Sequence, residues 1–210
     1  ISSAKIKAVL RFDSKIVASK IFHADHGRFN TQIRVPDPAG WTAETPDLYD
    51  LTLTLIDNGS NIDQLTEQIG LRQIEIKKGM LYINGKEVTF RGVARHDLWP
   101  EVGRALTDEM SRKDVEMMKK AGVNAVRTAH HTCEPAFIKW ADRLGLYIID
   151  NISMSNIPKE FYDDPNAVAA TLLRTNETVL RDRNNPSVII WAMGNEIHDI
   201  TLQHKKMYQR

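Results

Sequence analysis

The sequence lacks several features that would assign it to a class at once. It has one cysteine, Cys133, in 210 residues, so an internal disulfide and a cysteine-rich metal site are excluded. Its 28 basic and 27 acidic residues leave a net charge of +1, unlike the basic surface of a nucleic-acid-binding protein. No apolar run reaches the roughly 18 residues of a membrane-spanning helix. We therefore expect neither a nucleic acid nor a membrane as a partner.

The chain also lacks the usual signs of a protein start. It begins with Ile1, and its first residues show no signal-peptide pattern. Because alternation typical of a strand begins already at Ala4, we expect the chain to start inside a longer protein. What remains is an ordinary globular composition, with 42% hydrophobic and 26% charged residues.

Residues 1–76 have the pattern of an all-β domain. Apolar and polar residues alternate in short runs, Pro36, Pro38 and Pro46 mark a connection outside any central strand, and 57–59 (Asp-Asn-Gly) is a turn signal. This spacing favours an immunoglobulin-like β-sandwich, with a β-meander packed on the next domain as the alternative. The predicted strands are 5–12, 15–21, 29–35 and 48–55, followed by 73–76, 81–83 and 87–90 near the domain junction.

Residues 77–210 change in character, because strand and helix patterns alternate from residue 90 onward. Gly122 and Gly145 each follow a helical pattern and are typical helix stops. Short apolar strands alternating with helices predict a parallel sheet covered by helices. The predicted strands are 90–94, 124–129, 146–150 and 188–193, and the predicted helices are 107–121, 134–144 and 166–183, with a loop through Pro158.

Two parallel architectures fit this pattern, a flavodoxin-like open sheet and a (β/α)8 barrel. No G-x-G-x-x-G or Walker loop follows any predicted strand, so no dinucleotide or nucleotide cofactor is expected. Polar residues instead follow every strand of this half of the chain. Such convergence at the carboxyl ends of the strands is typical of a barrel active site.

Glu196 and Asn195 are the leading candidates for chemistry. They close an apolar strand that contains Trp191, and a carboxyl group partly removed from water there would have a raised pKa and could donate a proton at neutral pH. The Asn195 amide could donate a hydrogen bond to a substrate hydroxyl. The alternative is a structural role for Glu196, as a helix cap or as the ion-pair partner of Arg127.

Histidines and charged groups follow the other strands. His96, His130 and His131 could hold a metal ion together with Glu196, but their spacing matches no metal-binding motif, so we favour binding of sugar hydroxyls. Arg127 follows apolar residues and needs an acceptor; one structural alternative is a pair with Asp150. We also include Asp150, at a strand end, among the substrate-binding candidates.

Several motifs follow one another along the chain: residues 46–49 and 70–76 in the first domain, then Arg91-Gly92-Val93 with His96, then residues 124–130, 142–150 and 181–196. The most specific part is Asn-Pro-Ser-Val-Ile-Ile-Trp followed by Gly-Asn-Glu. Together these motifs resemble glycoside hydrolase family 2, which contains β-galactosidases, β-glucuronidases and β-mannosidases, and the resemblance covers nearly the whole chain. It implies a partial immunoglobulin-like β-sandwich (1–76) followed by the first half of a (β/α)8 TIM barrel (77–210).

The resemblance also implies roles for single residues. Glu196 would be the general acid/base, Asn195 would bind the sugar 2-hydroxyl, and Arg127 would orient the nucleophile. His96 and His130 would line the subsite for the terminal sugar. A retaining glycosidase places its two carboxyl groups about 5–5.5 Å apart, one as proton donor and one as nucleophile.

The family nucleophile lies on the seventh barrel strand, which this chain does not reach. We therefore expect part of a retaining β-glycosidase that acts on terminal β-linked sugars in an oligosaccharide or β-glycoside, inactive as this chain alone. Residues 151–155, after Asp150, lack the carboxylates found in many members, so no metal ion is expected. The alternative is a non-catalytic relative that binds carbohydrate or has a structural role. A homo-oligomer is compatible with the sequence.

Overall fold

The computed structural model describes residues 4–23, 28–152, 154–155, 160–161 and 164–196. The chain divides into two compact units, residues 1–41 with 47–72 and residues 42–46 with 73–210. The sequence placed the domain boundary after residue 76. None of the described helices is long and apolar enough to cross a membrane.

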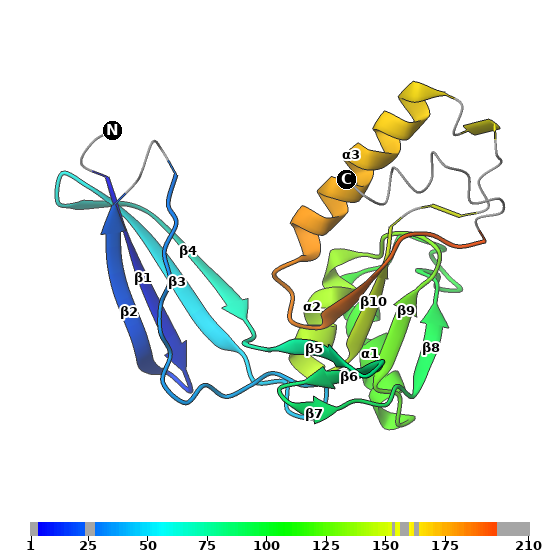
Figure 1. Ribbon diagram of the computed structural model, residues 1–210, viewed down its shortest axis with the longest axis horizontal. Coiled ribbons are helices and arrows are strands. Elements are labelled where there is room, and N and C mark those ends of the chain that lie inside the picture. Colours follow the sequence, from blue (N-terminus) through cyan, green and yellow to red (C-terminus); the bar gives the residue numbers. More distant parts are fainter. Residues whose placement is uncertain (1–3, 24–27, 153, 156–159, 162–163, 197–210) are drawn as a thin grey trace. The chain divides into compact units, whose positions relative to one another are not determined.

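The first unit contains a four-stranded antiparallel sheet (Figure 1). Strand β1 lies inside the sheet, in the order β2-β1-β3-β4, and its residues Ala8, Val9 and Leu10 are buried. One such sheet corresponds to one layer of the predicted sandwich. The strands are β1 (Lys5–Phe12), β2 (Lys15–His23), β3 (Tyr49–Asp57) and β4 (Ser60–Ile69).

The hairpin between β3 and β4 has the predicted turn. Asp57 pairs with Ser60, so Asn58 and Gly59 form a two-residue loop, and both have positive φ, 49° and 80°. This is the backbone of the hairpin turn that Asn-Gly favours. The turn prediction is confirmed.

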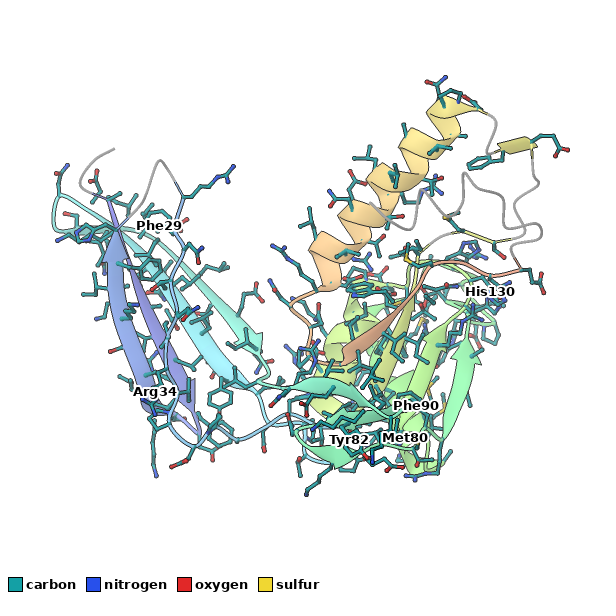
Figure 2. All side chains as sticks on the ribbon, in the orientation of Figure 1. Phe29, Arg34, Met80, Tyr82, Phe90 and His130 are labelled. Carbon is teal, nitrogen blue, oxygen red and sulfur yellow. The ribbon has the colours of Figure 1, made fainter. Side chains whose placement is uncertain are left out.

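One prediction in this unit was wrong, and one strand was missed. The predicted strand at 29–35 is not a strand, although exposure alternates from residue 31 to 35. Phe29 instead packs edge-on against Phe22 (ring centroids 6.1 Å apart), and the Lys20 side chain donates to the Gln32 carbonyl (2.9 Å); Phe29 is labelled in Figure 2. Strand β4 was missed, because nearly all its residues are exposed and its sequence shows no buried face.

After residues 42–46, the second unit continues with a small antiparallel sheet of β5 (Ile74–Lys77), β6 (Met80–Ile83) and β7 (Lys86–Glu87). Ile74 pairs with Ile83, so a boundary after residue 76 would cut through β5. The predicted strand at 87–90 is wrong beyond Glu87, where β7 ends, although the Val88 N–H still donates to the Leu81 carbonyl of β6 (3.0 Å).

Four parallel strands follow, in the spatial order β11-β10-β9-β8 (Figure 1). Each new strand is added beside the previous one without reversal. A flavodoxin-like sheet reverses its order at a switch point, whereas a barrel adds strands in sequence, so the barrel topology is confirmed. The strands are β8 (Gly92–Arg95), β9 (Ala125–Thr128), β10 (Tyr147–Asn151) and β11 (Val188–Ala192).

The three predicted helices are present, and their ends follow local capping rules. They are α1 (Asp108–Lys120), α2 (Pro135–Leu144) and α3 (Pro165–Asp182). The Thr107 hydroxyl accepts from the Met110 N–H at the start of α1, and Gly145 ends α2 in the left-handed conformation. The predicted loop up to Pro158 lies partly outside the described residues.

The core of this unit lies between the parallel sheet and its helices. Val126 of β9 and Ile148 of β10 are fully buried against Phe137 and Ile138 of α2. These residues alternate along their strands with others that face the opposite side of the sheet. The core therefore fixes which strand residues point toward the helices and which do not.

Residues 42–46 precede the rest of this unit in the sequence but are hydrogen-bonded to it. Lys119 Nζ donates to the carbonyls of Ala43 (2.8 Å) and Gly145 (2.7 Å). The Tyr147 hydroxyl donates to Glu44 (3.1 Å), and burial, aided by the Glu44 charge, raises the pKa of Tyr147 to about 12. The Ala43 carbonyl and the Glu44 carboxylate thus both hold residues 42–46 in place.

Candidate active site

The two predicted histidines are brought together at the carboxyl ends of β8 and β9. His96 follows directly after β8, and His130 lies two residues after β9. Their rings meet edge to face, with centroids 5.0 Å apart and planes at 85°, and Figure 2 shows His130 beyond the strand ends. His131 is mostly exposed; partial removal from water, Arg104 and the other two histidines lower its pKa.

Arg127 and Asn195 are also brought together. Arg127 Nη2 donates to the Asn195 side-chain oxygen (3.2 Å) and to the Gly194 carbonyl (3.5 Å). Arg127 is paired in register with Ile149, so its side chain and that of Asp150 leave the sheet on opposite faces. The structural alternative that paired Arg127 with Asp150 was wrong.

Glu196 follows Asn195 at the end of this segment, and the residue has a left-handed backbone (φ 47°). Within residues 1–210 Glu196 is exposed, and it lies four residues beyond Ala192, where β11 ends. Within the described residues no ion pair joins Glu196 to Arg127, which removes that structural alternative.

Asp150 does not lie with these residues. Its side chain is fully buried, accepts from the Thr128 hydroxyl (3.3 Å) and faces Asp182 of α3. The contact with α3 places it on the helix side of the sheet. The prediction that Asp150 contacts substrate does not fit this position, because alternation along β10 directs the side chain away from Arg127 and Asn195.

Burial and the charge of Asp182 raise the pKa of Asp150 to about 7, against the lowering effects of Arg181 and Thr128. Arg181 donates to both oxygens of Asp182 (2.7 and 2.6 Å) and to the Cys133 carbonyl (3.0 Å). Burial also raises the pKa of the Cys133 thiol. Neither Asp182, at the end of α3, nor Thr128, at the end of β9, was recognised in the sequence.

We expect Asp150 to make stability depend on pH. The folded protein keeps this proton up to about pH 7, whereas an unperturbed Asp releases it near 3.8. The stabilisation is therefore full below about pH 4 and is lost progressively as the pH rises through 7. Asp150→Asn keeps the neutral form, so its unfolding free energy relative to wild type should rise by about 2–4 kcal/mol between pH 5 and pH 8.

Urea unfolding at both pH values measures this difference. Asp50→Asn, at an exposed residue of β3, is the control and should follow wild type. If the free energies of unfolding of Asp150→Asn and wild type change by the same amount between the two pH values, the pKa of Asp150 is not raised in the folded protein.

A pocket of about 290 Å³ lies beside the histidines. The Arg95 guanidinium at its edge is buried, pairs with Asp97 and Asp114, and stacks on Phe137 (4.0 Å to the ring centroid). Asp97 also accepts from the Glu134 N–H at the start of α2 (2.8 Å). The lining residues are Arg95, His96, Asp97, Arg104, Ala129, His131, Thr132, Cys133, Glu134, Pro135 and Arg181.

Metal ligation was the other interpretation of the histidines. Among the residues that the structure describes, no three His, Cys, Asp or Glu side chains are grouped so that they could hold a metal ion. The structure instead shows two contacts near the strand ends. One is between the rings of His96 and His130, and the other is between the Arg127 guanidinium and the Asn195 amide. Such groups can donate hydrogen bonds to the hydroxyls of a sugar.

Family models match both units of the chain. Residues 74–210 match "Glycosyl hydrolases family 2, TIM barrel domain", and residues 3–72 match "Glycosyl hydrolases family 2". The chain belongs to glycosyl hydrolase family 2. This membership confirms the resemblance seen in the motifs and the predicted fold of a partial immunoglobulin-like sandwich followed by the first half of a TIM barrel.

Curated family 2 relatives include the beta-galactosidase of Photobacterium profundum, 40% identical over 169 residues that cover 78% of this chain and 16% of the relative. The beta-galactosidase of Lactococcus lactis subsp. lactis is 40% identical over 176 residues, 81% of this chain and 18% of the relative. The chain thus spans about a sixth of the length of the first of these relatives.

Solved family 2 structures share the fold. An FMN-binding beta-glucuronidase from Facaelibacterium prausnitzii L2-6 matches 99% of this chain and 32% of its own, with a TM-score of 0.90 and 25% identity. A beta-glucuronidase from Ruminococcus gnavus in complex with D-glucaro 1,5-lactone matches 100% of this chain and 35% of its own, with a TM-score of 0.87 and 24% identity.

Proposed function

We propose that this chain supplies the acid/base part of the active site of a retaining β-glycosidase that hydrolyses terminal β-linked sugars. The observation that carries the proposal is the position of Glu196, directly after an Asn195 whose amide is bonded to Arg127 (3.2 Å). Family membership supports it, because the curated relatives are named beta-galactosidases.

In the proposed first step Glu196 gives its proton to the glycosidic oxygen as the bond to the anomeric carbon breaks. A carboxylate from sequence after residue 210 forms a covalent bond to that carbon. In the second step Glu196, now ionised, takes a proton from water, and the water oxygen displaces the carboxylate. The sugar leaves with its original anomeric configuration, and both carboxyl groups return to their starting states.

The other residues of the site would bind the sugar. Asn195 would donate to the 2-hydroxyl, and His96 and His130 would line the subsite of the terminal sugar. Arg127 already holds Asn195, and a guanidinium has further N–H groups with which to orient the nucleophile. We leave Asp150 out of this set, because its buried carboxyl faces α3.

We expect residues 1–210 alone to show no hydrolysis, and the chain continued through the remaining barrel strands to be active. A parallel half-barrel exposes an open strand edge and lacks the second carboxyl group. Release of nitrophenol from aryl β-galactoside and aryl β-glucuronide measures the activity of both proteins. NMR of the first product formed should show retained configuration.

Three outcomes contradict the proposal or part of it. Turnover by residues 1–210 alone would mean that the nucleophile lies within this sequence. A completed barrel that binds glycosides but cleaves neither substrate would favour the non-catalytic, carbohydrate-binding relative. A product of inverted configuration would remove the retaining mechanism while keeping the glycosidase.

A further inference from the structure

The Asn195 amide is held by a residue to which no role has been assigned. Its side-chain nitrogen donates to the Ser155 hydroxyl (3.3 Å), while its side-chain oxygen accepts from Arg127 (3.2 Å). Its backbone N–H donates to the Met154 carbonyl (2.8 Å). Asn195 is therefore bonded at three atoms, before any substrate is present.

The contact with Ser155 continues the pairing of two barrel strands. β10 and β11 pair in parallel up to Asn151 and Ala192, and Ile152 N–H then donates to the Ala192 carbonyl (3.1 Å). Ser155 and Asn195 form a further parallel bridge beyond both strand ends. The backbone that precedes Glu196 is thus tied to the segment after β10 rather than left as a free loop.

The chemistry of the three side chains fixes which way the amide faces. A guanidinium has only donors, so the oxygen of Asn195 must face Arg127. The NH₂ group then faces Ser155, whose hydroxyl oxygen can accept. One of the two amide hydrogens is used in this bond, and the second remains to donate elsewhere.

We propose that Ser155 is a positioning residue of the active site, which holds the Asn195 amide so that its second N–H donates to the sugar 2-hydroxyl. The proposal rests on the proposed function. Without the Ser155 hydroxyl the amide keeps its bond to Arg127, but its NH₂ group loses a fixed acceptor and orients the sugar less well. A neutral hydrogen bond of this kind has a modest net effect, so we expect a loss of about three- to tenfold.

The test compares Ser155→Ala with wild type in the completed enzyme, using an aryl β-glycoside and its 2-deoxy analogue. Ser155→Ala should lower kcat/KM about three- to tenfold for the parent glycoside and leave kcat/KM for the 2-deoxy analogue nearly unchanged, because that analogue has no 2-hydroxyl to accept the bond. Ser155→Thr keeps a hydroxyl and should recover most of the activity. Ser60→Ala, at an exposed residue of β4, is the control and should change neither substrate.

The outcomes separate the two proposals. An equal loss on both substrates, a loss not recovered by Ser155→Thr, or no loss at all would overturn the role of Ser155 while leaving the glycosidase intact. Absence of turnover in wild type would overturn the proposed function and the role of Ser155 together. Melting temperatures of all variants distinguish lost orientation from lost folding.

Discussion

Glu196→Gln is expected to lower kcat of the completed enzyme by about 10²–10⁴-fold on an alkyl β-glycoside. An alkoxide is a poor leaving group, so bond cleavage depends on the proton that Glu196 donates. The amide of Gln has nearly the same size but has no acidic proton to transfer. Because the substitution keeps the size of the side chain, it should leave folding and substrate binding intact.

Steady-state kinetics on two leaving groups tests this assignment. An activated aryl glycoside needs little protonation, so its cleavage step should be less impaired by Glu196→Gln than that of the alkyl glycoside. Glu177→Gln, at an exposed residue of α3, changes the same functional group elsewhere and should behave as wild type. If Glu196→Gln stays within about threefold of wild type on the alkyl substrate, Glu196 is not the acid.

Gly145→Ala should lower the free energy of unfolding by about 3–5 kcal/mol, at the upper end of single-residue effects. Gly145 has φ +83°, and an added Cβ would lie 2.2 Å from the Ala43 carbonyl oxygen and 2.9 Å from its carbon. Both are backbone atoms that cannot rotate away. Lys119 holds the same carbonyl at 2.8 Å, so moving residues 42–46 to relieve the clash would break that bond.

Gly122→Ala is the matched control. Gly122 also follows a helix and has φ +77°, but an added Cβ would meet nothing within 4 Å. Gly122→Ala should lower the free energy of unfolding only by the backbone strain of a left-handed alanine, about 1 kcal/mol. Urea unfolding of both variants measures the difference, and equal costs for the two substitutions would show that the segment around Ala43 does not press on Gly145.

The positions of the strands and helices in the second unit followed from local pattern. Apolar strands of four or five residues, Thr107 before α1 and Gly145 after α2 are signals that act within a few residues of chain. Local pattern did not predict strands correctly where strand formation depends on pairing with another segment. Residues 29–35 alternate without being a strand, and β4 is a strand without a buried face, because pairing is decided by the backbone of another segment.

The residues of the candidate site were likewise predicted only in part. His96, His130 and Asn195 were recognised because each follows a strand, and Arg127 because it lies near the end of one. Parallel strands bring such positions to one end of the sheet. Asp150 met the same criterion, yet the structure places it on the helix side. Side chains one residue apart leave a strand on opposite faces, and sequence position at a strand end does not say which face is the functional one.

The sequence by itself determined the family, the order of strands and helices, and the segment that ends in Asn195 and Glu196, because these depend on local patterning and specific motifs. Only the tertiary structure decided that Asp150 meets Asp182 and that Ser155 holds Asn195. Those facts depend on strand register and on contacts between residues 32 and 40 positions apart, which local patterning does not encode.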